Sequence, residues 1–161
     1  MATDYILEIE GIKGESTDSK VQGGIELLSW GLGVSNTGSH AAGGGGGVGK
    51  ASYSDFAATA AVNKASPLLM LACATGQHIK KAVLHVRKQG GEQQEYMTIT
   101  MTELLVSSYN SGDAPGGDVA VIDSFSLNYT TIKFEYKPQK PDGSLDSAVT
   151  AGYDLKQNKK M

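Results

Sequence analysis

Residues 119–136 alternate apolar and polar side chains, and the alternation changes phase partway along. The apolar residues occupy odd positions from Phe125 to Tyr129 and even positions from Ile132 to Tyr136. In a β-strand this moves the buried side chains from one face to the other, as an extra residue near 130–131 would do. A strand of this kind turns from one sheet into another, which predicts a compact mostly-β fold, a two-sheet barrel or sandwich.

A second phase change is found near the N-terminus. Ile25 and Leu27 share one parity, and Leu28, Trp30 and Leu32 share the other, so we expect a bulge between Leu27 and Leu28. Before this segment, residues 5–10 have the character of a strand. After it, residues 53–64 fit either a helix, because of their alanines, or a strand.

The next strands form a predicted hairpin. Residues 79–88 alternate, and residues 89–92 (Gln89, Gly90, Gly91 and Glu92) read as the hairpin tip. In the return strand, Met97, Ile99 and Met101 point to one face, and Thr98, Thr100 and Thr102 point to the other. One face is therefore apolar and one polar. Residues 153–155 are expected to form a short last strand.

One helix is predicted, over residues 66–76. Ser66 is expected to be its N-cap, Pro67 fits the first turn, and Gly76 can close the C-terminus in the left-handed conformation. Residues 68–74 are apolar on all sides, so we expect the helix to be covered on both sides. Cys73 lies in this apolar stretch and reads as a small buried side chain.

Residues 33–50 contain almost no large apolar side chain. They form either a flexible surface loop or an extended arm ordered by another subunit. The glycines partly match the motifs of nucleotide-binding loops, but we do not predict nucleotide binding. Ala51 replaces the metal-binding Ser or Thr of such loops, and no helix follows directly. The residues expected to contact another subunit are Gly43, Gly44, Gly45, Gly46, Gly47, Val48 and Gly49.

Composition excludes several classes of function. The chain has 161 residues, which favours one domain, 1–161, and 14 basic against 17 acidic residues give a net charge of −3. This balance argues against a nucleic-acid partner. No apolar run approaches the ~20 residues that span a bilayer, and residues 1–5 do not resemble a signal peptide. We therefore expect no membrane insertion.

Catalytic and metal motifs are also missing from the sequence. His40, His78 and His85 have no neighbouring ligand spacing that would form a metal site, and no serine lies in a nucleophile-elbow motif. We expect no cofactor, no metal and no enzymatic activity. The unexplained features are the apolar helix, the glycine-rich loop and the polar strand faces, which together indicate a subunit of an assembly.

Several motifs, in order along nearly the whole chain, resemble the haemolysin-coregulated protein (Hcp) family of bacterial type VI secretion. As a set they are specific. They are residues 5–16 (YILEIEGIKGES), the segment around Trp30, residues 43–50 (GGGGGVGK), 66–70 (SPLLM), 87–91 (RKQGG), 105–108 (LVSS), 125–129 (FSLNY) and 135–139 (EYKPQ).

The resemblance implies a two-sheet β-barrel or sandwich flanked by one short helix, similar to phage tail tube proteins. It also implies hexameric rings that stack into the inner tube of a contractile injection machine. The implied partners are other rings, the tip spike, the sheath and effector proteins in the lumen. Assembly in the bacterial cytoplasm would be followed by export without a signal peptide. The resemblance also favours strand over helix for residues 53–64.

The sequence is also compatible with two alternatives to a secretion tube subunit: a phage-derived tail tube subunit and a monomeric β-sandwich binding module. On the Hcp reading, the hairpin tip 89–92 is a candidate rim for ring stacking. The candidate lumen wall consists of Ser29, Gly31, Thr98, Thr100 and Thr102.

Overall fold

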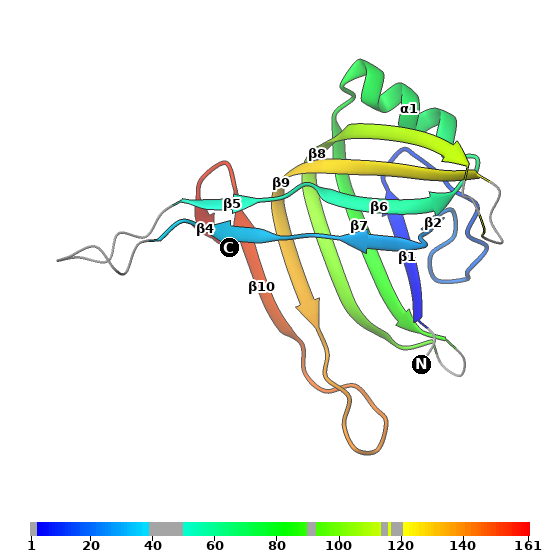
Figure 1. Ribbon diagram of the computed structural model, residues 1–161. Coiled ribbons are helices and arrows are strands. Elements are labelled where there is room, and N and C mark those ends of the chain that lie inside the picture. The colour runs from blue at the N-terminus through cyan, green and yellow to red at the C-terminus, as the bar shows by residue number, and fades with distance from the viewer. Residues whose placement is uncertain (1–2, 39–49, 90–92, 114–115, 117–120) are drawn as a thin grey trace.

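The computed structural model describes residues 3–38, 50–89, 93–113, 116 and 121–161 (Figure 1). They form strands and one helix, α1, Ser66–Thr75. The strands are β1 Thr3–Ile9, β2 Ile25–Glu26, β3 Ser29–Gly31, β4 Val34–Asn36, β5 Ala51–Tyr53, β6 Phe56–Ala61, β7 Ile79–Lys88, β8 Glu95–Asp113, β9 Val121–Tyr136, β10 Val149–Asp154 and β11 Lys159–Lys160. The fold is mostly β with one short helix, as predicted.

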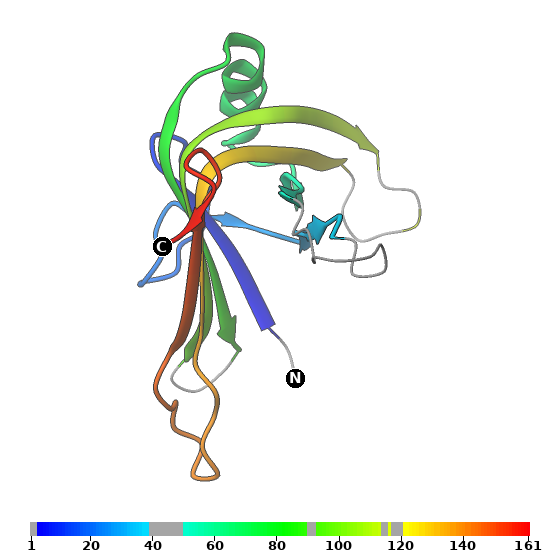
Figure 2. The same cartoon turned by 90° about the vertical axis from the view of Figure 1, so that its left-hand side faces the viewer.

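Two layers of strands share β8 and β9. In the back layer the strand order is β11-β10-β9-β8-β7-β1-β2. The front layer contains residues 105–113 of β8 and 121–129 of β9, which pair with each other. There β9 also pairs with β6, and β6 pairs with β3. The strands of the front layer run across those of the back layer (Figures 1 and 2). No ladder among the described residues joins β2 to β6, so the layers form a sandwich and not the closed barrel that was its alternative.

The predicted corner in β9 is present, and β8 has a matching one. Tyr129 and Ile132 are both buried with two residues between them, and Met101 and Leu104 on β8 repeat this spacing. Because both strands change phase at the same level, their pairing register continues unchanged across the corner. The backbone of Glu103 accommodates the bend with a φ of 50°.

The other phase change marks a change of hydrogen-bond partner. The amide of Leu27 donates to the carbonyl of Tyr5 on β1, whereas the amide of Leu28 donates to the carbonyl of Thr59 on β6. The chain therefore crosses from the back layer to the front layer between these two residues. The expected irregularity is thus a break between β2 and β3, with each of the two strands belonging to a different layer.

Helix α1 confirms the predicted segment but corrects its start. Ala65 is the N-cap, no side chain caps the helix, and Gly76 closes the C-terminus with a φ of 65°. Ser66 lies inside the helix, where its hydroxyl bonds instead to the buried carboxylate of Asp123 on β9. A buried carboxylate needs a hydrogen-bond donor, which explains why the Ser66 hydroxyl bonds to Asp123 and does not cap the helix.

The core lies between the two layers and beneath α1. It includes Leu7, Phe56, Leu84, Ile99 and Leu127, each fully buried. Residues 53–64 do not form a helix: β5 ends at Tyr53 and β6 covers Phe56–Ala61. The last predicted strand is part of β10, which ends at Asp154 and pairs with β11. No helix among the described residues is long and apolar enough to span a membrane.

Candidate assembly surfaces

Small polar side chains line the outer face of the front layer. Ser29 on β3 bonds to Thr59 on β6 at 2.6 Å, and Ser126 on β9 bonds to Ser107 and Ser108 on β8 at 2.7 and 2.5 Å. Gly31 belongs to the same face, since it pairs with Ala57 two residues from the Ser29–Thr59 pair. These side chains bond mainly to one another, and Ser107 also donates to the carboxylate of Asp55 at 2.7 Å, so the surface is polar. We call it the serine face.

The threonines predicted for the same wall lie elsewhere. Thr98, Thr100 and Thr102 are in the back layer, on the face that points away from the core, and their register partners on β9 are Glu135, Lys133 and Thr131. The serine face and this threonine face are therefore the two opposite outer surfaces of the sandwich. The sequence gives no hint of this, because the strands that carry the two sets belong to different layers.

A charged cluster borders the threonine face. His85 on β7 pairs with Thr98, and its Nδ1 lies 3.0 Å from Glu95 while its Nε2 lies 3.8 Å from Glu8 on β1. Burial lowers the pKa of His85, but the hydrogen bond and charge of Glu95, with the charge of Glu8, outweigh it and raise the pKa above 6.5. The two carboxylates thus favour the protonated imidazole.

The segment 33–50, predicted as a loop or an extended arm, is not irregular throughout, because residues 34–36 form strand β4. β4 and β5 pair with each other and continue from β3 and β6, so the front layer extends past the sandwich (Figure 1). Tyr53 stacks on Tyr153 of β10, with ring centroids 5.5 Å apart, and Tyr129 donates to the carbonyl of Ser54 at 2.9 Å. Burial raises the pKa of Tyr129 to about 12. These contacts fix the root of the arm, whereas Gly43, Gly44, Gly45, Gly46, Gly47, Val48 and Gly49 lie outside the described residues.

The candidate rim is described only at its edges. β7 and β8 pair on either side of it, and Gln89 donates to Asp4 at 2.5 Å, while Gly90, Gly91 and Glu92 lie outside the described residues. Beside it is a feature that the strand pattern did not predict. Arg87 is 1% exposed and donates two hydrogen bonds of 2.8 Å to Asp18, which ties the loop between β1 and β2 to the back layer.

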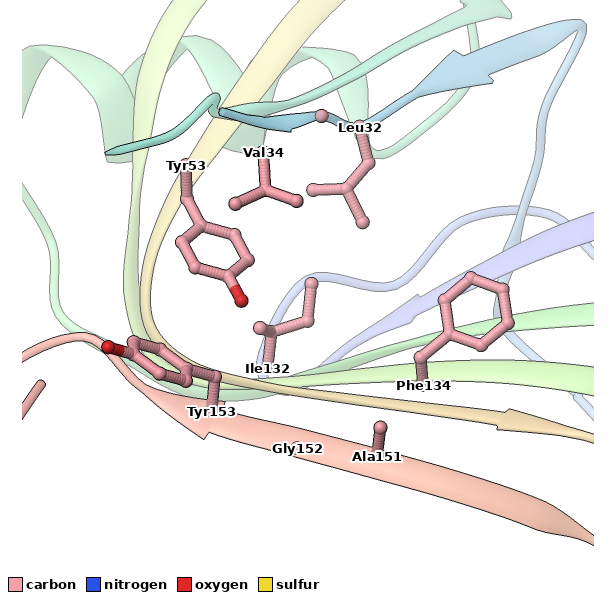
Figure 3. A pocket seen from close by; sticks show the side chains of 9 residues that line it. Leu32, Val34, Tyr53, Ile132, Phe134, Ala151, Gly152 and Tyr153 are labelled. Atoms are coloured by element: carbon pink, nitrogen blue, oxygen red, sulfur yellow. The ribbon is translucent and has the colours of Figure 1, made fainter. Parts of the chain in front are cut away.

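An apolar groove opens between the arm root and the back layer, with a volume of about 480 Å³ (Figure 3). Its upper wall comes from β4, β5 and the residues just before β4, and its lower wall comes from β9 and β10. The side chains point toward one another across it, and none carries a charge. The groove is lined by Leu32, Val34 and Tyr53 above and by Ile132, Phe134, Ala151 and Tyr153 below.

The histidines and the cysteine, for which the sequence predicts no catalytic or metal role, lie apart from one another. His78 contacts Glu103 at the surface, Cys73 is partly buried in α1, and His40 lies outside the described residues. Within the described part of the chain, no group of three or more His, Cys, Asp or Glu side chains has the arrangement of a metal site. Among the described residues of the front layer, Asp123 is the one buried carboxylate, and Ser66 and Tyr109 donate to it. Its role is structural, since both of its oxygens are satisfied.

The described residues thus form a sandwich with two polar outer faces, an exposed apolar groove and a projecting hairpin. Comparison with known proteins identifies the family. The model of the family described as "Type VI secretion system effector, Hcp" matches residues 6–136, and the chain belongs to this family.

Individual relatives match over the whole length. The chain is 41% identical over 160 residues to protein hcp1 of Pseudomonas aeruginosa, with 98% of each chain covered. Among solved structures, Hcp1 from Salmonella typhimurium has a TM-score of 0.81 and 35% identity, with all of both chains covered. A structure described as a type six secretion system protein has a TM-score of 0.93 and 29% identity, with 99% of this chain and 100% of that chain covered.

Proposed function

We propose that this protein is the structural subunit of a type VI secretion tube, in which six copies form a ring and rings stack into the tube. The observation that carries the proposal is the front layer. Among the described residues, both of its edge strands pair on one side only: residues 105–113 of β8 pair with β9, and β3 pairs with β6. Two unpaired edges on one sheet are templates for pairing with further copies.

Edge pairing of this kind is heterologous, because the β3 edge of one copy meets the β8 edge of the next. Heterologous contacts close into a ring when the rotation between copies allows it. The front layers of successive copies would then form one continuous wall. The four strands alternate in direction, so β3 of one copy and β8 of the next are also antiparallel.

The serine face is the surface we assign to the lumen of this ring. It lies on the layer with the unpaired edges, and its hydroxyls satisfy one another. A wall made mainly of hydroxyl groups can contact effector proteins of different sequence without binding any of them tightly, since it offers no large apolar area. Ser29 and Gly31 are therefore kept as lumen residues. Thr98, Thr100 and Thr102 are assigned to the outer surface.

The remaining partners follow from the same assembly. The glycine arm at 43–49 would reach a neighbouring subunit or ring, and the hairpin tip 89–92 would contact the next ring. The tip spike and sheath would meet the stacked rings at their end and outer surface. Assembly would take place in the bacterial cytoplasm before export. In this role the protein is a scaffold and not an enzyme.

Light scattering tests the ring directly. We expect a particle of six times the 16.8 kDa mass of one chain. A monomer at every concentration up to the millimolar range would overturn the proposal. The phage-derived alternative gives a similar particle, and is distinguished by whether the gene lies beside secretion genes or virion genes.

The lumen assignment has its own test. Ser126→Trp places a bulky side chain on the serine face, and Thr100→Trp places the same side chain on the opposite outer surface. We expect Ser126→Trp to reduce the amount of a co-expressed secretion effector that purifies with the ring, while Thr100→Trp leaves it unchanged. The opposite result would assign the lumen to the threonine face.

A further inference from the structure

We propose that helix α1 of one copy of this chain seats in the apolar groove of the next copy, and that this contact is the main apolar joint of the ring. The inference rests on the ring proposed above and names the parts that meet in it. One chain carries both halves of the contact, a convex helix face and a concave groove.

The helix supplies an apolar ridge that its own chain leaves uncovered. Ser66, Leu69 and Ala72 are buried against the sandwich, while Leu68, Met70 and Leu71 are 43%, 56% and 54% exposed. Leu68 and Leu71 are three residues apart and therefore neighbours on the side of α1 that faces away from the core, and Met70 lies on the other flank of that side. The sequence predicted a helix covered on both sides, and within one chain only one side is covered.

The groove is the matching cavity. Val34 and Phe134 on its two walls are 59% and 40% exposed, so the described residues leave much of its apolar surface uncovered. Neither Ser66–Thr75 nor the groove lining contains a charged residue. The two surfaces are thus matched in charge, since a charged occupant would lose its hydration in the groove without gaining an opposite charge.

The positions of the two surfaces fit one joint. Helix α1 lies above the upper strand of the front layer, β8, whereas the groove opens beside β4, which continues from β3, the lower edge strand of that layer (Figures 1 and 3). These are the two unpaired edges. When the β8 edge of one copy meets the β3 edge of the next, the helix of the first copy lies on the side of the second copy where β3 continues into β4, and the proposed contact requires a strand register that brings the helix to the groove.

The same geometry explains why the groove is open. In each chain α1 closes the space between the layers at the β8 side, and no element of the described part of that chain closes it at the β4 side. A helix from the next copy completes the sandwich there. Because ridge and groove are different surfaces of one chain, the contact is heterologous, as a ring requires.

Disulfide trapping tests the contact. In a Cys73→Ser background, Leu71→Cys is combined with Val34→Cys and the protein is oxidised under native conditions. We expect covalent species from dimer to hexamer on a denaturing gel, with the series ending at six. The matched control combines Leu71→Cys with Lys140→Cys, in the exposed loop between β9 and β10, and should remain monomeric on the gel.

Other outcomes overturn the inference in distinguishable ways. A ring by light scattering with no Leu71–Val34 disulfide removes the helix-in-groove contact but keeps the proposed function. A series that continues past six places the helix between rings, not within one. A protein that stays monomeric would contradict both the helix-in-groove contact and the proposed function.

A charge substitution gives an independent measurement. Leu71→Asp puts a carboxylate on the exposed ridge, where it leaves the single chain folded, and we expect the dissociation constant of the ring to rise at least about tenfold. Lys64→Glu, an exposed change just before α1, serves as the control and should leave ring assembly unchanged. Circular dichroism confirms the fold of both variants. Equal assembly of Leu71→Asp and the parent chain would contradict the joint.

Discussion

At the scale of single residues, the ion pair between Arg87 and Asp18 links two parts of the fold that are distant in sequence. Arg87 is buried, and Asp18 accepts two hydrogen bonds from it and two more from the amides of Lys20 and Val21. The Arg87 hydrogen bonds lower the pKa of Asp18 to about 2, against the opposing effect of burial. The loop between β1 and β2 is held to the sheet through this carboxylate.

Replacing Asp18 leaves the buried guanidinium without a counter-charge. We expect Asp18→Asn to lower the free energy of unfolding by about 3 kcal/mol. Urea denaturation at pH 7 measures it, with exposed Asp113→Asn as the control, expected to change stability by less than about 0.5 kcal/mol. Because the pKa is depressed, the contribution is present above the ordinary value of 3.8 and is lost as pH falls toward about 2. Equal stability of Asp18→Asn and the parent protein would contradict this account.

His85 titrates in the opposite sense. Its pKa is raised above 6.5 by Glu95 and Glu8, despite burial, so the folded state favours the protonated ring. Its contribution to stability is full below pH 6.5 and is lost as pH rises through the folded-state value. NMR titration of the imidazole should show the raised pKa, and Glu95→Gln should lower it. A Glu95→Gln variant with an unchanged pKa would assign the shift to another group.

At the scale of elements, the loop between β1 and β2 depends on two close backbone approaches. A Cβ on Gly14 would lie 2.5 Å from the carbonyl oxygen of Gly24, and a Cβ on Gly24 would lie 2.4 Å from the Ile6 side chain. Both are closer than atoms can pack, and in the first case the neighbour is backbone. This loop therefore needs glycine for space.

Gly14→Ala should destabilise the protein by about 1–3 kcal/mol, because the backbone must shift to admit the methyl group. Gly112→Ala is the control, since a Cβ there meets nothing within 4 Å. Thermal denaturation compares the two variants. A similar melting temperature for both would show that the loop adjusts freely.

The arm is the second element with a separable role. Its root is fixed by Tyr53, Tyr129 and Tyr153 inside one chain. Deleting residues 43–47 should therefore leave the melting temperature of the sandwich within a few degrees of the parent protein while weakening ring or tube formation. Sedimentation at equal concentration measures assembly. An unchanged sedimentation profile would remove the arm from the interface.

At the scale of the whole molecule, the proposed joint is uncharged, and this sets its response to salt. Ionic strength screens exposed charges but leaves apolar contacts intact. The hexamer should therefore persist between 0.1 and 1 M sodium chloride, measured by light scattering at a concentration near the dissociation constant of the ring. Dissociation at high salt would indicate that ion pairs, and not the groove and helix, hold the ring.

The sequence by itself determined the local elements. The alternation of apolar and polar residues predicts the hairpin of β7 and β8, and Pro67 and Gly76 predict the segment of α1. The phase change before Ile132 predicts the corner in β9. All three signals come from residues that are neighbours in the sequence. Residues 53–64 needed the family resemblance, because alanine is compatible with both helix and strand. The Ser66 cap was predicted wrongly, since Asp123, distant in sequence, competes for the hydroxyl.

Only the tertiary structure decided which faces meet and which are left open. It separates Ser29 from Thr98 onto opposite outer surfaces, buries Arg87 against Asp18, and brings Leu32 and Val34 opposite Phe134 in one groove. Periodicity assigns a side chain to one of two faces of its own strand, but not to a layer of the sandwich. That assignment depends on pairings between strands far apart in the chain, such as β6 with β9, which no local pattern encodes.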